Sequence, residues 1–296
     1  MSVDRFTKVA PTLFVLLWSS AFIGAKLGLP FAEPLTFMFL RFIAVSLIFL
    51  FLSFIFKASW PKSWIQVGHI AIVGLLIQTL YLNSTFIALS HGSPVGIASL
   101  ILGLQPALTV LLVSFIPGGR VSKIQWIGIL LGLLGLIFVL YDKLAFDEAK
   151  WWSIYILGFG VCCITLGTIY QRRFCSDMNL LTGNFIQTFI GVVGTGIAAF
   201  YFESMNVIWE PEFIVALLWM ILVVSLGAHT LLLFMLRKNQ VAKVTSLLYL
   251  TPPTATVMAF LVFDEFLTPL AIVGMVITVL GVSLVVRVKT INKEAL

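Results

Sequence analysis

A few polar side chains lie deep inside long apolar stretches of this 296-residue sequence, where they suit solute binding better than catalysis. Arg41 stands well inside one stretch, and because a charge in hydrocarbon is unfavourable, its guanidinium should face protein or water. It could attract an anionic solute group such as a carboxylate, or it could bond helix ends or extend toward the membrane surface. His229 lies midway along another stretch, where an imidazole could exchange a proton near neutral pH or stay neutral and hydrogen-bonded.

Aromatic and amide side chains occur at similar depths. Trp18 lies far from the interfaces where tryptophan is enriched, so its ring either stacks on a solute or packs between helices. Gln78, Tyr81 and Thr85 recur at spacings of three and four, which puts them on one face of a helix. Such a face either lines a cavity or hydrogen-bonds neighbouring helices, and the sequence leaves both interpretations open.

Prolines interrupt two apolar stretches in corresponding places. Pro106, next to Gln105, leaves the carbonyl of Leu102 without its helical hydrogen bond, which creates a kink and a free acceptor. Tyr249 precedes Pro252, the first of two adjacent prolines. Because interrupted helices at matching places in two halves indicate a transport site, we include these four polar, aromatic and proline residues in the candidate binding site.

The sequence holds no arrangement typical of catalysis or metal binding. It contains no HExxH pattern, no CxxC spacing among its three cysteines, and no Asp or Glu deep in an apolar stretch. We therefore expect neither an enzyme nor a cofactor. A membrane-embedded enzyme and a channel stay as the alternative functions.

Membrane helices must position these side chains. Hydrophobic residues make up 60% of the chain and charged residues only 10%, with a mean hydropathy of +1.12, whereas a soluble domain carries about 25% charged residues. A helix of about 20 apolar residues crosses a bilayer. The sequence predicts an all-α polytopic membrane protein with ten transmembrane helices, at 10–29, 35–56, 65–90, 94–116, 124–141, 152–171, 180–202, 213–236, 244–263 and 269–286.

The charges between these stretches alternate along the chain. If the N-terminus is cytoplasmic, most of the 18 Lys and Arg residues fall in cytoplasmic loops and most acids fall outside. We therefore expect a plasma (inner) membrane protein with both termini cytoplasmic. The basic pI of about 9.3 reflects this orientation, so nucleic acid is not an expected partner.

Two stretches of the chain resemble each other at a nearly constant offset. Residues 98–112 align with 245–259, so that Pro106 matches Pro253, and residues 34–42 align with 180–188. The chain therefore divides into repeats at 1–146 and 147–296. Because each repeat has an odd number of helices, the second five-helix repeat should be inverted in the bilayer.

The sequence resembles the drug/metabolite transporter superfamily, specifically its EamA-type members. The resemblance covers nearly the whole chain and is carried by LLWSSAFIGAKLGL (16–29), PLTFMFLRF (34–42), SPVGIASLILGLQPALTVLL (93–112) and VFDEFLTPLAIVGMVITVLGVSLVV (262–286). It implies ten helices, two repeats and export of small metabolites such as amino acids or drugs. The chain departs from the pattern at Pro117-Gly118-Gly119-Arg120, where members often have Gly-Glu-Arg, whereas Asp264-Glu265-Phe266 keeps the acid.

Together these observations predict a secondary transporter, most simply an exporter, of small organic metabolites. The two halves would pivot around a central cavity, opening it to each side of the membrane in turn. Its partners would be a small-molecule solute and the lipid bilayer. The sequence does not fix the solute, the energy source or the oligomeric state, and a homo-oligomer is compatible with it.

Overall fold

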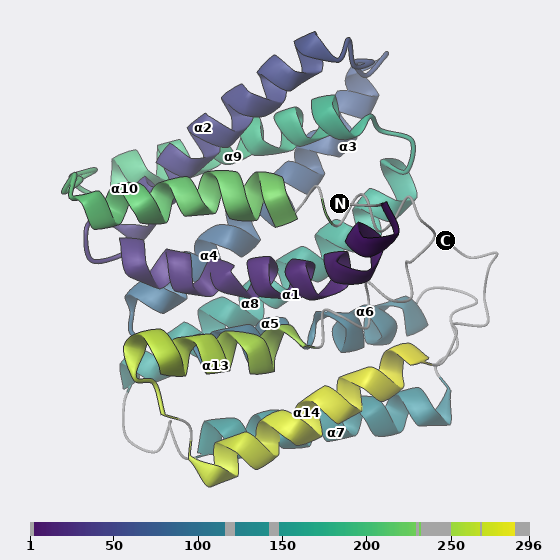
Figure 1. Ribbon diagram of the computed structural model, residues 1–296. Coiled ribbons are helices and arrows are strands. Elements are labelled where there is room, and N and C mark those ends of the chain that lie inside the picture. Colours follow the sequence, from purple (N-terminus) through teal and green to yellow (C-terminus); the bar gives the residue numbers. More distant parts are fainter. Residues whose placement is uncertain are drawn as a thin grey trace.

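The computed structural model describes residues 3–115, 122–141, 148–228, 231, 250–266 and 268–287. These ranges are almost entirely helical, and within them the only β-type pairing is an isolated bridge between Ala32 and Val207. Figure 1 shows the helices as roughly parallel rods that lie across the view. The all-helical fold expected from the sequence is therefore confirmed for the described part of the chain.

The described helices follow the predicted apolar stretches. In the first half they are α1 (Val3–Gly28), α2 (Pro34–Ile55), α3 (Trp64–Gly74), the π-helix η1 (Leu75–Tyr81), α4 (Leu82–Ser90), α5 (Val95–Leu102), α6 (Gln105–Ser114) and α7 (Lys123–Tyr141). In the second half they are α8 (Glu148–Phe174), α9 (Leu180–Phe202), α10 (Pro211–Leu218), the π-helix η2 (Trp219–Ala228), α13 (Thr251–Phe263) and α14 (Pro269–Arg287). Local sequence sets several starts: Pro34 and Pro211 begin helices, and the Asn179 side chain accepts a hydrogen bond from the Leu181 N–H.

Seven helices among the described residues are long and apolar enough to cross a membrane. Three of the predicted stretches coincide instead with shorter apolar helices, at 123–139, 251–263 and 269–285. The multi-pass membrane architecture is therefore clear from the structure. The count of ten crossings stays a prediction.

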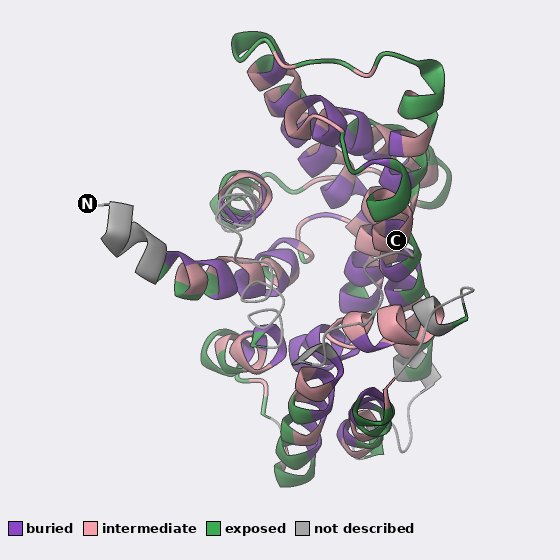
Figure 2. Ribbon diagram, turned by 90° about the vertical axis from the view of Figure 1, so that its right-hand side faces the viewer, coloured by how far each residue is buried: buried purple, intermediate pink, exposed green. Residues whose placement is uncertain are grey.

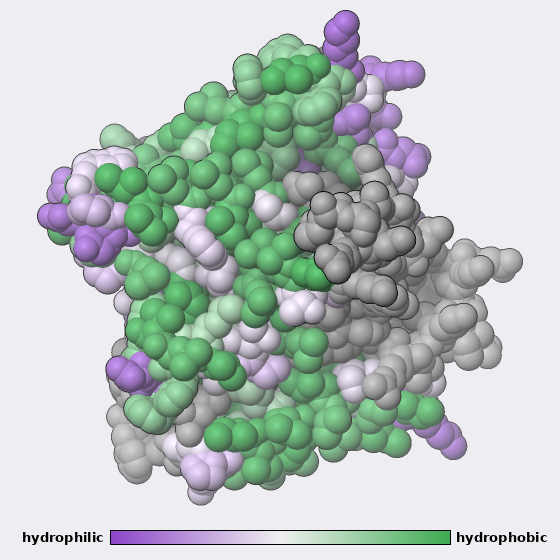
Figure 3. Space-filling view, in the orientation of Figure 1, coloured by the Kyte–Doolittle hydropathy of each residue, from purple (hydrophilic) through white to green (hydrophobic). Residues whose placement is uncertain are grey.

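Large apolar side chains cover the outside of the molecule. Leu47, Phe51, Leu130 and Phe200 are each more than half exposed, whereas Thr195 is fully buried. Figure 3 shows hydrophobic residues over most of the described face and hydrophilic residues gathered toward its two ends. Figure 2 shows that individual helices turn buried faces inward and exposed faces outward. Such an apolar exterior suits lipid rather than water as the surrounding solvent.

Helices that correspond in the two halves pack on each other. The helix pairs α7–α14 and α2–α9 make the most extensive contacts in the described structure and lie at opposite edges of the bundle in Figure 1. Gly128 of α7 packs on Gly281 of α14, and Gly135 packs on Gly274. Because the start of one helix meets the end of the other, α7 and α14 run antiparallel. Small residues allow this close backbone approach.

The first helix of each half packs against equivalent helices of the other half. Helix α1 packs on α13 and η2 of the second half, and its counterpart α8 packs on α6 and η1 of the first half. The core of the bundle therefore lies between the halves rather than within either one. Side chains there come from both halves, and they define the site described next.

Two glutamates clasp α2 to α9 at one end of the bundle. The Glu203 carboxylate, just after α9, accepts hydrogen bonds from the backbone N–H groups of Leu35 and Thr36 at 2.8 and 2.7 Å. In return, the Glu33 carboxylate accepts from the Ser204 N–H and hydroxyl at 2.8 and 2.7 Å. An anion at the start of a helix accepts hydrogen bonds from its free N–H groups and interacts favourably with the helix dipole.

Candidate functional site

A cavity of about 180 Å³ lies between the two halves. This volume is more than ten times what one water molecule needs, so it has room for a small organic solute. Its walls come from α1, α2, η1, α4, α8, α9 and η2, and its polar or charged lining residues are Arg41, Gln78, Tyr81, Thr85, Asn184, Thr188 and Ser225. Most of the remaining lining is apolar, including Phe22, Phe42, Phe49 and Phe86.

Four of the candidate residues meet in this cavity. Trp18 comes from α1, Arg41 from α2, and Gln78 and Tyr81 from η1. Thr85, the third member of the predicted polar face, also lines the cavity from α4. The helical face read from their spacing therefore lines a cavity, and its role in solute binding stays a prediction.

Arg41 is the charged residue of the described cavity wall. Its side chain is 7% exposed, and its Nε and Nη2 donate to the Ser225 hydroxyl oxygen at 3.1 and 3.0 Å. Its Nη1 lies 3.8 Å from the Met38 sulfur, a weak acceptor. The Ser225 hydroxyl in turn donates to the Met220 carbonyl at 2.8 Å. A residue of the second half thus holds the guanidinium of the first.

Each half contributes a π-helical segment to the cavity wall. Gln78 and Tyr81 lie on η1, and Met220, Val224 and Ser225 lie on η2. π-Helical turns are rare and concentrate at functional sites. They occur here at corresponding places in the two halves, since Ser225 follows Gln78 by 147 residues, the offset that separates Pro106 from Pro253.

Gln105, Pro106 and Pro252 lie away from the cavity wall. The chain leaves the helix at Gly103, between α5 and α6, as expected from Pro106. Gln105 donates through Nε2 to the Thr168 hydroxyl of α8 at 3.4 Å. Pro252 stands in the first turn of α13, so close to Gly103 that a Cβ added there would lie 2.9 Å from the proline ring. The place of these three residues in the solute site stays a prediction.

His229 and Tyr249 lie outside the described residues. The predicted proton exchange at His229 and the place of Tyr249 in the binding site therefore stay predictions as well.

The structure adds cavity residues that the sequence did not single out. Ser225 holds Arg41, and Asn184 and Thr188 contribute polar atoms from α9. Ser225 could have been found from the repeat, as the counterpart of Gln78. Asn184 carries no comparable signal, because an amide in an apolar helix can equally well bond its own backbone, and here its Nδ2 does donate to the Leu180 carbonyl at 2.7 Å.

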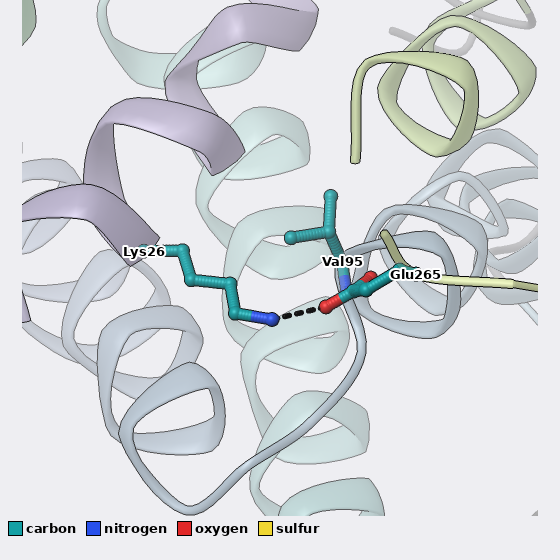
Figure 4. A network of polar contacts seen from close by, with 3 residues as sticks. All are labelled: Lys26, Val95 and Glu265. Atoms are coloured by element: carbon teal, nitrogen blue, oxygen red, sulfur yellow. Dashed lines mark hydrogen bonds and ion pairs between the residues drawn. The ribbon is translucent and has the colours of Figure 1, made fainter. Parts of the chain in front are cut away.

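An ion pair joins the halves at one end of the bundle (Figure 4). Lys26, near the end of α1, pairs with Glu265, which follows α13. The second oxygen of Glu265 accepts from the Val95 N–H at the start of α5, at 3.0 Å. Both partners are partly buried, with 33% and 17% of their side chains exposed. One carboxylate therefore connects the second half to two elements of the first.

Comparison with known proteins gives this architecture a family. The model of the EamA-like transporter family matches the chain twice, over residues 11–141 and 150–287. The chain belongs to the EamA-like transporter family. The double match places one EamA unit in each half, and it agrees with the family resemblance read from the sequence motifs.

Relatives of this EamA protein align along nearly its whole length. It is 25% identical over 289 residues to an Escherichia coli (strain K12) protein named "Probable amino-acid metabolite efflux pump", covering 94% of both chains. It is 26% identical to the "Uncharacterized transporter YvbV" of Bacillus subtilis (strain 168), covering 94% of this chain and 91% of the relative. It is 24% identical to the E. coli (strain K12) "Uncharacterized inner membrane transporter YedA", covering 95% and 92%.

A solved structure shares the fold of this EamA protein. It is titled "Crystal structure of protein", and the two superpose with a TM-score of 0.66 over 94% of this chain and 96% of the other, at 18% identity. At that identity the likeness concerns the fold alone.

Proposed function

We propose that this protein is a secondary transporter that exports small organic solutes, such as amino acids or drugs, by alternating access. Ten membrane helices would form two inverted five-helix repeats, 1–146 and 147–296, which pivot about the central cavity. The observation that carries the proposal is the cavity itself, since its wall is shared by both halves and gathers Trp18, Arg41 and the π-helical residues. Transport sites lie at such a junction between repeats.

The packing of corresponding helices supports the inversion. α7 and α14 occupy the same place in their halves, yet they run antiparallel, with Gly128 on Gly281 and Gly135 on Gly274. The clasp of Glu33 and Glu203 gives α2 and α9 the same antiparallel relation. Two units with the same order of helices and opposite directions are what an inverted repeat requires.

The Lys26–Glu265 ion pair supports alternating access. It bridges the halves at the end of the bundle that the charge pattern makes extracellular, so it favours closure there. At the repeat-related position, 146 or 147 residues before Glu265, the sequence has Gly119 or Gly118. By sequence, the repeat-related position at the proposed cytoplasmic end therefore has no carboxylate. We infer that the ion pair stabilises the conformation closed to the outside.

Several finer features accompany the proposal. The basic loops support a cytoplasmic location for both termini. The inner membrane is the location given in the name of the E. coli relative YedA. Export and an amino-acid metabolite as solute follow the name of the other E. coli relative. His229, Gln105, Pro106, Tyr249 and Pro252 are kept as candidates that contact the solute or shape its path.

Measured flux tests the proposal. The full chain is reconstituted in proteoliposomes loaded with a panel of labelled metabolites, and efflux is followed in the wild type and in Arg41→Ala. We expect saturable efflux of at least one compound and a loss of most of it in Arg41→Ala. Lys62→Ala, which removes an exposed charge outside the cavity, is the matched control.

Three other outcomes would contradict the proposal. Non-saturable flux that grows linearly with solute concentration would favour a channel. A new compound formed from the panel by purified protein would favour an enzyme. Equal efflux from wild type and Arg41→Ala, with equal amounts of protein in the vesicles, would remove the cavity as the site.

A further inference from the structure

Within the described part of the chain, the wall of the central cavity carries a positive charge without a carboxylate to balance it. Arg41 is buried, and among the described residues of the wall there is no Asp or Glu. Its partners there, the Ser225 hydroxyl and the Met38 sulfur, are both neutral. A buried charge is normally compensated by an opposite charge. The charge of the Arg41 guanidinium would therefore be compensated when an anion binds in the cavity.

The guanidinium has donors left over for that anion. Arginine carries five N–H groups, and the Ser225 oxygen and the Met38 sulfur leave part of them unused. Gln78 and Tyr81 line the same cavity, and their side chains have no hydrogen-bond partner within the described part of the chain. A guanidinium, an amide and a phenol together form a set of donors that matches the oxygens of a carboxylate.

The other polar groups of the wall are already engaged. The Thr188 hydroxyl donates to the Asn184 carbonyl at 2.8 Å, and the Thr85 hydroxyl donates to the Tyr81 carbonyl at 3.1 Å. Among the described residues of the wall, an ammonium group would meet Arg41 as a like charge and would find neutral oxygens and aromatic faces but no carboxylate. The cavity is therefore unfavourable for a cationic solute group.

The rest of the wall suits an apolar body. Trp18, Phe22, Phe42, Phe49 and Phe86 all face the cavity. The Trp18 ring is supported by Phe14, with 5.4 Å between the ring centroids. Aromatic walls with one charged anchor are typical of sites that take an apolar molecule by its single polar end.

We propose that the transported solute is a small organic carboxylate with an apolar or aromatic body and without an ammonium group. Arg41 binds the carboxylate, Gln78 and Tyr81 complete its hydrogen bonds, and the aromatic wall takes the body. This substrate class rests on the transport function proposed above. It narrows the solutes proposed above to amine-free carboxylates and excludes zwitterionic amino acids, which carry an additional positive charge.

Four compounds that share one phenylethyl body test the solute class. Purified full-length protein in detergent is titrated by calorimetry with 3-phenylpropionate, 3-phenylpropanamide, phenylalanine and phenethylamine. We expect 3-phenylpropionate to bind about ten- to a hundredfold more tightly than the amide, as charge-assisted hydrogen bonds imply, and more tightly still than the amine. A second set on an aliphatic hexyl body shows whether the ranking follows the charged group rather than the ring.

Variants of Arg41 test whether this residue causes the ranking of affinities. In Arg41→Gln the advantage of the carboxylate over the amide should disappear, and in Arg41→Lys, which keeps the charge but loses the planar fork, part of it should remain. Lys62→Gln removes an exposed charge outside the cavity and should leave the ranking unchanged. Should Arg41→Gln fail to fold, the wild-type ranking of the four compounds still decides.

The solute class and the transport function fail in different ways. If phenylalanine or phenethylamine binds as tightly as 3-phenylpropionate, or if none of the compounds binds while another class does, the solute class is wrong. The same conclusion follows if the carboxylate advantage survives in Arg41→Gln. If no compound of any class shows protein-dependent flux in proteoliposomes, the transport function itself is wrong.

Discussion

Gly128 and Gly281 meet backbone to backbone where α7 crosses α14. A Cβ added to Gly128 would lie 2.5 Å from the Gly281 carbonyl oxygen, and one added to Gly281 would lie 2.6 Å from that of Gly128. The neighbouring atoms are backbone, which cannot rotate away. The two helices can therefore approach this closely only because both positions are glycine.

Replacing Gly281 by alanine should destabilise the protein. The new methyl group has to push α14 away from α7, and such overpacking costs about 1–3 kcal/mol. Thermal unfolding in detergent should show a lower midpoint. Gly158→Ala on α8 is the matched control, because a Cβ there meets nothing within 4 Å, and its midpoint should stay the same or rise. An unchanged midpoint for Gly281→Ala would contradict this packing.

Removing the Lys26 charge should open the extracellular end of the bundle. Lys26→Gln breaks the ion pair with Glu265 but leaves the hydrogen bond from Val95 to Glu265 in place. A cysteine at Ala25, which lines the cavity, should then react faster with an impermeant maleimide added from outside. The control is Glu212→Gln, an exposed charge at the start of α10. Slower or equal labelling in Lys26→Gln would rule out the proposed stabilisation of the closed end.

Single cysteines should map corresponding loops to opposite sides of the membrane. In a chain whose three natural cysteines are replaced by serine, Lys57→Cys and Asp177→Cys should react only with reagent on the cytoplasmic side. Asn206→Cys should react only from outside. Positions 57, 177 and 206 are exposed in the structure. The inverted arrangement is wrong if 57 and 206, which follow the corresponding helices α2 and α9, are labelled from the same side.

Glu203 should contribute measurably to stability by capping α2. Its carboxylate holds the N–H groups of Leu35 and Thr36, so Glu203→Ala leaves them without this partner. Loss of a cap typically costs about 0.5–2 kcal/mol. Glu210→Ala is the control, because Glu210 precedes α10 without making a side-chain cap hydrogen bond. Equal unfolding midpoints for the two variants would contradict the assigned role of Glu203.

Much of the fold follows from apolar stretches and the repeat. A polar side chain in an apolar helix must avoid lipid, and Arg41, Gln78 and Tyr81, which this rule predicts to face the interior, line one cavity together with Trp18. Spacing rules succeed where one helix positions all the residues concerned, as for Gln78 and Tyr81.

Contacts between distant segments could not be predicted in this way. Lys26 and Glu265 are 239 positions apart, and Arg41 and Ser225 are 184 positions apart, so each pair depends on how the halves pack. The proline pattern was ambiguous for a related reason. Pro106 does accompany a helix break, but whether such a break faces the solute or a neighbouring helix depends on the packing of α6 against α8.

The π-helices η1 and η2 give each half a segment whose hydrogen-bond pattern can change from π-helical to α-helical. A π-turn holds one residue more than an α-turn, and tightening it would rotate the segment beyond it by about 100° while the helix stays continuous. In η1 such a rotation would carry Tyr81 around the axis, and in η2 it would carry Ser225. Tightening one π-turn would therefore move a polar residue of the cavity wall, in addition to the pivoting of the two repeats.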